Sequence, residues 1–170
     1  MTAASFEVIG GKKLKGEIVP QGAKNEALQI ISAILLTDEK VTITNIPDIL
    51  DVNNLIDLLA AMNVKVDRVD RQTCVFQADD VNLNYLRTED FRTRSSRLRG
   101  SVMLAGPMLA RFKKAFIPKP GGDKIGRRPL DTHILSFEKL GAEYVYHSDD
   151  GFFHLHTDGL KGTYILLDEP

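Results

Sequence analysis

The sequence lacks tryptophan, and it holds a single cysteine, Cys74, among its 170 residues. One thiol excludes an intramolecular disulfide and a zinc site built from several cysteines. No apolar run approaches the ~20 residues of a membrane-spanning helix. The residues after Met1 show no basic segment followed by an apolar stretch, so we expect no secretory signal. Together these absences favour a cytosolic protein.

Aromatic residues are also few, at 7% of the chain, whereas hydrophobic residues make up 43% and charged residues 26%. This composition is typical of a soluble globular protein, and a chain of this length fits one domain or two small ones. Cys74 lies in an apolar run, where we expect it to pack as a small hydrophobic residue.

The formal net charge is only −1, but the charges are unevenly distributed. Between Arg87 and Arg128, twelve basic residues face three acidic ones. This excess favours a site for an anion, such as phosphate, a nucleotide or nucleic acid, over the alternative of a solvated basic face. A binder of single-stranded nucleic acid would place aromatic side chains among these cations, yet only Tyr85, Phe91 and Phe112 lie near them.

The apolar residues predict two successive copies of a helix–strand–helix–strand–strand unit. Ile43 aligns with Ile117, 74 positions later, whereas residues 59–64 align with 137–142, 78 positions later. The second copy is therefore four residues longer, and the extra residues fall between Ile117 and Pro129. Four helices are expected: one that begins near Lys24, and three that cover 55–62, 98–109 and 130–140. The expected strands cover 41–44, 64–66, 74–76, 115–117, 144–146 and 152–155.

Three further strands are expected outside the two copies, at 6–9, 14–19 and 164–167. Two residues carry additional expectations. Pro107 should disturb the hydrogen bonding of the helix over 98–109, and Asp51 should cap the N-terminus of the helix that follows it.

The inserted loop, residues 118–129 (PKPGGDKIGRRP), is rich in glycine and in cations. Glycine lets backbone amides approach a ligand closely, and an arginine such as Arg128 can grip a phosphate with two parallel hydrogen bonds. The loop leads into a helix at Pro129, and a helix N-terminus favours an anion. It matches neither the Walker pattern nor the dinucleotide fingerprint. A surface loop without a ligand would account for its composition equally well.

Two residues are candidates for chemistry at an anion site. Asp123 is the one acid of the basic loop, and it is either part of a local ion pair or an acid/base group beside an anionic substrate. Lys24 stands with Asn25 at the start of a predicted helix, where the helix dipole disfavours a cation. Such a local conflict is typical of functional sites, although a plain surface lysine is the alternative.

Several short motifs stand in a fixed order along the whole chain: LKGE at 14–17, GAKN at 22–25, RGS at 99–101, GPMLARF at 106–112, PGG at 120–122, IGRRP at 125–129 and DTH at 131–133. In this order and spacing they resemble the enolpyruvyl transferases, and among them the UDP-N-acetylglucosamine 1-carboxyvinyltransferases. The resemblance implies an α/β (α+β) fold of repeated helix–strand–helix–strand–strand units. It also implies that these units form an incomplete inside-out α/β barrel-like domain.

The resemblance also implies roles for individual residues. Lys24 and Asn25 would contact phosphoenolpyruvate, and Arg99 would bind substrate in the same cleft. Arg128 would grip a phosphate, and the residues after it would line the uridine side. The substrates would be phosphoenolpyruvate and UDP-N-acetylglucosamine, with no metal, cofactor, nucleic acid or membrane involved. The residues implied on the uridine side are Pro129, Leu130, Asp131 and Thr132.

Asp123 departs from the family pattern. Most members have cysteine at this place, where it protonates the methylene carbon of phosphoenolpyruvate and is alkylated by the antibiotic fosfomycin. A carboxylic acid can make the same proton transfer if bound phosphate and closure of the loop keep it protonated. It should not form the stable thioether, so we expect an active but fosfomycin-resistant enzyme.

The extent of the match is a second departure, because family chains are much longer and the match stops near Pro170. We therefore expect a fragment that lacks the second half of the family's chain and is inactive alone. Residues 1–21 would complete the other domain, and 22–170 would form a truncated, repeat-built substrate-binding and lid domain. Two alternatives stay open: a transferase that acts on a shikimate phosphate, and a non-catalytic module that binds anions or nucleic acid.

Overall fold

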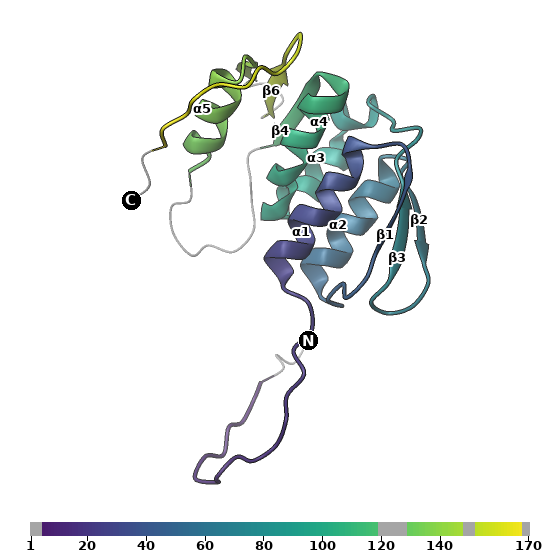
Figure 1. Cartoon of the computed structure of the whole chain (residues 1–170), viewed down its shortest axis with the longest axis vertical. Coiled ribbons are helices and arrows are strands. Elements are labelled where there is room, and N and C mark those ends of the chain that lie inside the picture. Colours follow the sequence, from purple (N-terminus) through teal and green to yellow (C-terminus); the bar gives the residue numbers. More distant parts are fainter. Residues whose placement is uncertain (1–4, 119–128, 148–151, 168–170) are drawn as a thin grey trace.

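A computed structural model describes residues 5–118, 129–147 and 152–167, and it contains the predicted repeat (Figure 1). Each unit runs helix, strand, helix, strand, strand, and a linking region stands between the two units. The first unit comprises α1 (Lys24–Ala33), β1 (Lys40–Ile43), α2 (Leu50–Ala61), β2 (Lys65–Arg68) and β3 (Cys74–Gln77). The second comprises α4 (Ala105–Phe112), β4 (Lys114–Pro118), α5 (Asp131–Lys139), β5 (Glu143–His147) and β6 (Phe152–His156). The remaining elements are α3 (Glu89–Ser96) and three 3₁₀ helices, η1 (Ile34–Leu36), η2 (Tyr85–Arg87) and η3 (Arg99–Leu104).

The two sheets have the same topology. Their strand orders are β1-β3-β2 and β4-β6-β5, and every neighbouring pair is antiparallel. The outer strands of each sheet are therefore parallel to each other, with a helix in the connection between them and the third strand inserted, as in a split βαβ unit. Ile43 lies opposite Cys74 in the first sheet, and Ile117 lies opposite Phe153 in the second. β1 begins at Lys40 and β4 at Lys114, 74 positions later, which agrees with the predicted alignment of Ile43 with Ile117.

Backbone hydrogen bonds confirm the second predicted offset, of 78 positions. Where α2 ends, the amide of Val64 donates to the carbonyl of Leu59 over 3.0 Å. Where α5 ends, the amide of Ala142 donates to the carbonyl of Phe137 over 2.8 Å. Since donor and acceptor are both displaced by 78 residues, the two helix-to-strand turns have the same construction.

The hydrophobic core lies mainly in the first unit and the linking region. α2 buries five side chains, among them Leu55 and Ile56, whereas no residue of α5 is fully buried. Cys74 is buried at 1% exposure, and burial raises the pKa of its thiol. The expectation that Cys74 packs as a hydrophobic residue is confirmed.

The expectation of one helix over 98–109 is wrong. The chain forms η3 and then α4, and Pro107 is the third residue of α4. Amides in the first turn of a helix have no acceptor within it, so the proline there costs no hydrogen bond. Periodicity also missed α3, because Phe91 and Ser95 are the only residues that it buries. This helix begins after Thr88, whose side chain accepts a hydrogen bond from the amide of Phe91.

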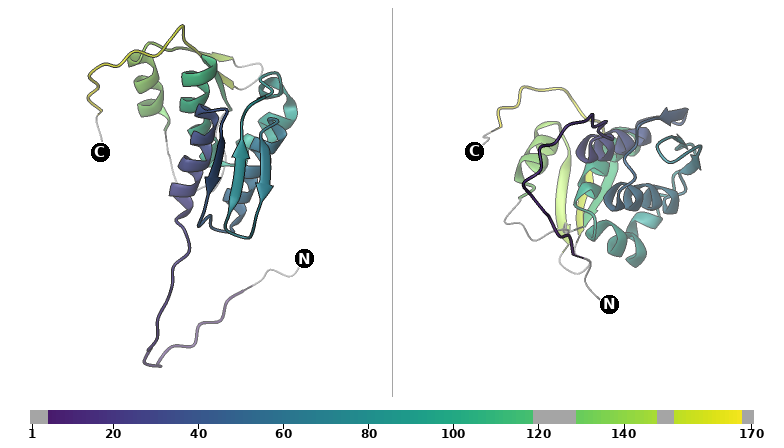
Figure 2. Two further views of the ribbon diagram at one scale, coloured as in Figure 1. Left: turned by 45° about the vertical axis from the view of Figure 1, so that its right-hand side comes forward. Right: turned by 90° about the horizontal axis from the view of Figure 1, so that it is seen from below.

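Strands expected at 6–9, 14–19 and 164–167 are absent from the structure. A strand needs the amides and carbonyls of a neighbouring strand, and the described part of the chain offers none to these segments. Residues 5–21 project away from the body instead (Figures 1 and 2). Apolar side chains therefore remain in water, with Phe6 99% and Leu14 97% exposed. In the described residues no helix is both long enough and apolar enough to cross a membrane.

Candidate functional site

A cavity of about 300 Å³ brings together α1, α2, η3 and α5. Three of the predicted site residues, Lys24, Asn25 and Arg99, line it. They come from two segments that are more than seventy residues apart in the sequence, so the fold gathers them at one place. The full lining comprises Lys24, Asn25, Leu28, Gln29, Asp51, Arg99, Gly100, Val102, Met103 and His133.

Two glycines make the close packing around this cavity possible. A Cβ on Gly22 would lie 2.1 Å from the carbonyl oxygen of Asn45, so only glycine allows the chain to enter α1 along this path. A Cβ on Gly100 would lie 2.9 Å from a methyl carbon of Leu28. Glycine there lets η3 approach α1 and places Arg99 beside the start of that helix.

Asn25 and Lys24 form the first turn of α1. The N-cap residue, Ala23, has no side chain that can bond the first amides of the helix. Amides in this position attract anions, and the helix dipole adds to that attraction. The lining thus combines the start of a helix with the cations of Lys24 and Arg99, which suits a phosphate or a carboxylate.

Asp51 resolves the conflict that the sequence shows at Lys24. The ammonium Nζ of Lys24 lies 2.9 Å from Oδ2 of Asp51, and both side chains are about half exposed. The carboxylate compensates the unfavourable position of a cation at a helix N-terminus. The expectation that Asp51 caps its own helix is wrong, because Ile49 is the N-cap of α2 and Asp51 lies inside the first turn.

The predicted residues on the uridine side do not line this cavity. Leu130 is buried in the core, whereas Pro129, Asp131 and Thr132 are exposed around the start of α5. Their neighbour His133 lines the cavity in their place. Asp123 and Arg128 lie outside the described residues, and their roles stay predictions.

Sequence reasoning did not assign three polar members of the lining to the site. Gln29 follows Asn25 by one helical turn, so the spacing could have found it. His133 stands in the DTH motif, next to the basic loop. Asp51 gives no sequence signal, because its contact with Lys24 crosses 27 residues and exists only after α1 and α2 pack.

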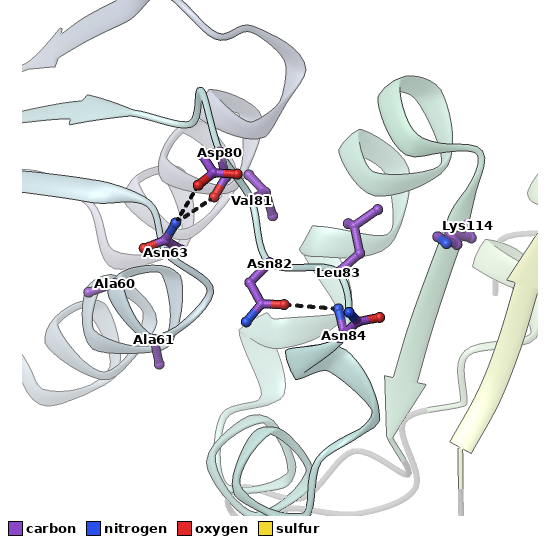
Figure 3. A pocket seen from close by; sticks show the side chains of 9 residues that line it. All are labelled: Ala60, Ala61, Asn63, Asp80, Val81, Asn82, Leu83, Asn84 and Lys114. Atoms are coloured by element: carbon purple, nitrogen blue, oxygen red, sulfur yellow. Dashed lines mark hydrogen bonds between the residues drawn. The ribbon is translucent and has the colours of Figure 1, made fainter.

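A larger hollow of about 710 Å³ lies elsewhere, between the end of α2, the segment after β3 and Lys114 (Figure 3). Its polar groups bond one another: the side-chain amide of Asn63 donates to the carbonyl of Asp80 over 2.8 Å, and the amide of Asn84 donates to the side chain of Asn82 over 3.1 Å. It contains none of the predicted site residues. The smaller cavity is therefore the candidate site.

Comparison with known proteins places the chain in a family. The family model of EPSP synthase (3-phosphoshikimate 1-carboxyvinyltransferase) matches residues 8–169. The chain belongs to this family. Two solved structures share its fold: the enolpyruvyl transferase NikO from Streptomyces tendae, with TM-score 0.68 and 21% identity, and EPSP synthase from Acinetobacter baumannii, with TM-score 0.61 and 14% identity. They match 89% and 91% of this chain, which covers 32% and 35% of theirs.

Within the family, the chain is most informatively compared with UDP-N-acetylglucosamine 1-carboxyvinyltransferases. It is 63% identical over 166 residues to the enzyme of that name from Porphyromonas gingivalis, and 57% identical to that from Bacteroides thetaiotaomicron. Each match covers 98% of this chain. The chain spans only 38% of the length of these relatives. The resemblance to enolpyruvyl transferases, and the α/β fold of repeated units that it implies, are confirmed.

Proposed function

We propose that this chain supplies the phosphoenolpyruvate-binding part of an enzyme that transfers an enolpyruvyl group to the 3-hydroxyl of UDP-N-acetylglucosamine, a step in the synthesis of peptidoglycan precursors. The observation that carries the proposal is the cavity lined by Lys24, Asn25 and Arg99. Relatives that carry this name are 63% and 57% identical to the chain, which supports the choice of acceptor.

The reaction is an addition followed by an elimination. The 3-hydroxyl of the sugar adds to C2 of phosphoenolpyruvate and loses its proton, while an acid protonates C3. The tetrahedral intermediate then gives up the C3 proton and inorganic phosphate, which leaves an enolpyruvyl ether. Asp123 is proposed as the acid at C3.

The chain's own contribution is electrostatic. Phosphoenolpyruvate carries a phosphate and a carboxylate, and the developing phosphate leaving group adds charge to the same place. Lys24 and Arg99 in the cavity would balance this charge, with Arg128 proposed as a third cation. Preorganised donors of this kind make the largest single contribution to the rate enhancement of many enzymes, and removal of one lowers the rate by about 10²–10³.

The rest of the enzyme would come from the part of the relatives that this chain does not span. We propose that residues 1–21 pair with that part, because the large apolar side chains of the described residues 5–21 are exposed here. Residues 22–170 would form the substrate-binding domain with its lid. The chain alone is then expected to be inactive.

A chimera tests the function: this chain continued by the remainder of the Porphyromonas gingivalis relative, called the full-length chimera below. With phosphoenolpyruvate and UDP-N-acetylglucosamine it should release phosphate, and with shikimate 3-phosphate it should not. Release only with shikimate 3-phosphate would establish the rival transferase. No release with either acceptor, together with salt-sensitive oligonucleotide binding, would favour a nucleic-acid module.

Fosfomycin tests the proposed role of Asp123. The full-length chimera should keep its activity after incubation with fosfomycin, because a carboxylate forms no stable thioether. Asp123→Cys should remain active and become sensitive. Inactivation of the unmodified chimera, with the mass of fosfomycin found covalently attached at Asp123 and not at Cys74, would contradict the proposal.

A further inference from the structure

The cavity contains an acid as well as its cations. Among the described residues that line it, Asp51 is the only carboxylate, and it shares the lining with Lys24, Arg99 and His133. A carboxylate repels an anionic ligand, so its presence in a site for anions needs another explanation. The carboxylate Oδ2 of Asp51 forms an ion pair with Nζ of Lys24, over 2.9 Å.

We infer that Asp51 is a positioning residue that holds the Lys24 ammonium toward the cavity. The inference rests on the proposed function and deepens it, since it names a residue that acts on phosphoenolpyruvate only through Lys24.

The chemistry of the lysine side chain supports this role. An ammonium has three donors, and Asp51 accepts from one of them, which leaves two for a ligand. A free lysine side chain samples many rotamers, and fixing it in advance removes that entropy cost from the step in which ligand binds.

The backbone position of Asp51 is fixed by the packing of α2. It lies in the first turn of α2, where the helix dipole favours a carboxylate. α2 packs beside α1, and it buries Val52 and Leu55, which follow Asp51 by one position and by one helical turn. The two helices therefore fix the distance between the backbones of Lys24 and Asp51, and the ion pair bridges a gap that packing sets.

The pair also stays accessible. The Lys24 side chain is 47% exposed and that of Asp51 is 43% exposed, so a ligand can reach the remaining donors without breaking the pair. A second ion pair, between Lys65 and Asp79, has similar chemistry but lies away from the cavity. It supplies a matched control.

The test is Asp51→Asn in the full-length chimera, with Asp79→Asn as control. A mispositioned ammonium should lower kcat by about 10- to 100-fold. The KM for phosphoenolpyruvate should stay level or fall, because a negative charge has left the site. Asp51→Glu, which keeps a carboxylate one methylene further out, should recover part of kcat. Asp79→Asn should leave both constants unchanged.

Several outcomes would overturn the inference. If Asp51→Asn binds phosphoenolpyruvate more tightly with kcat unchanged or raised, Asp51 only competes with the ligand. If Asp51→Asn and Asp79→Asn lower the unfolding midpoint and kcat alike, the role is structural. An unmodified chimera that releases no phosphate would contradict the proposed function first and the positioning role with it, whereas an active chimera with a fully active Asp51→Asn variant would contradict the positioning role alone.

Discussion

The first repeat unit buries its second helix, whereas the second unit leaves the equivalent helix near the surface. α2 follows β1, and α5 follows the equivalent strand β4. Both helices end in the same kind of turn and lead into strands, β2 and β5, that pair in the same register with the middle strand of their sheet. Even so, α2 is packed between α1 and the linking region, while α5 covers little more than its own sheet (Figures 1 and 2). Equal backbone paths therefore do not imply equal contributions to stability.

This difference also describes the candidate site. The well-packed side of the cavity provides Lys24, Asn25, Asp51 and Arg99, whereas the exposed helix α5 provides His133. Charged groups that must keep a fixed geometry thus stand on the buried framework. The remaining wall comes from the more loosely packed unit that carries the basic loop.

Equivalent isoleucines give the largest expected difference between the units. Ile56 of α2 is 2% exposed, and Ile134, which occupies the same place in α5, is only partly buried. Ile56→Ala should lower the free energy of unfolding by about 2–5 kcal/mol through lost burial and a residual cavity. Ile134→Ala should cost less than half as much as Ile56→Ala. Urea unfolding of the chain measures both, and equal losses would contradict the account of the two helices.

Arg111 should give the next largest effect, because it ties α4 of the second unit to the first. Its Nη1 donates to the carbonyls of Leu35, Thr37 and Ala78 at 3.2, 2.8 and 2.8 Å. Arg111→Met keeps the apolar stem and leaves these carbonyls without their charged donor, at a cost of about 1.5–3 kcal/mol.

Arg68 supplies the control for Arg111. In the described part of the chain its side chain makes one exposed hydrogen bond, to Asn53, so Arg68→Met should change the free energy of unfolding by less than about 1 kcal/mol. The same urea titration measures the two variants, and a similar loss in both would show that the bonds of Arg111 do not join the units.

The turn after each second helix gives the smallest expected effect. Asn63 has φ 70° and the equivalent Gly141 has φ 94°, so both lie in the left-handed region. Asn63→Ala should cost about 1–2 kcal/mol, because alanine tolerates this conformation poorly and the side-chain bonds to Asp80 are lost. Asn63→Gly, which copies the second unit, should cost less. Thermal unfolding that ranks glycine below alanine would contradict the shared construction of the turns.

The repeat could be predicted from the sequence because it rests on local periodicity and on two constant offsets. The strands that contain Ile43 and Ile117 are examples, because the apolar pattern that identifies each strand spans only a few consecutive residues. α3 could not be predicted, because it buries too few residues to leave a stripe. The predictions of strands at 6–9 and 14–19 were wrong for another reason: local propensity cannot provide a neighbouring strand as a hydrogen-bonding partner.

The candidate site was predictable to a similar degree. The motifs placed Lys24, Asn25 and Arg99 in one cleft, and the structure gathers these three around one cavity. The motifs did not find Asp51, because its ion pair with Lys24 depends on how two helices pack. Whether the three residues bind substrate stays a prediction.

The central claim is that Lys24 acts on phosphoenolpyruvate, and the rate of phosphate release by the full-length chimera tests it most directly. Lys24→Met should lower this rate by about 10²–10³ in the presence of UDP-N-acetylglucosamine, because a preorganised cation is lost from the leaving phosphate. Lys65→Met, which breaks an ion pair of similar exposure away from the cavity, should change it by less than about twofold. Equal rates for the two variants would contradict the account.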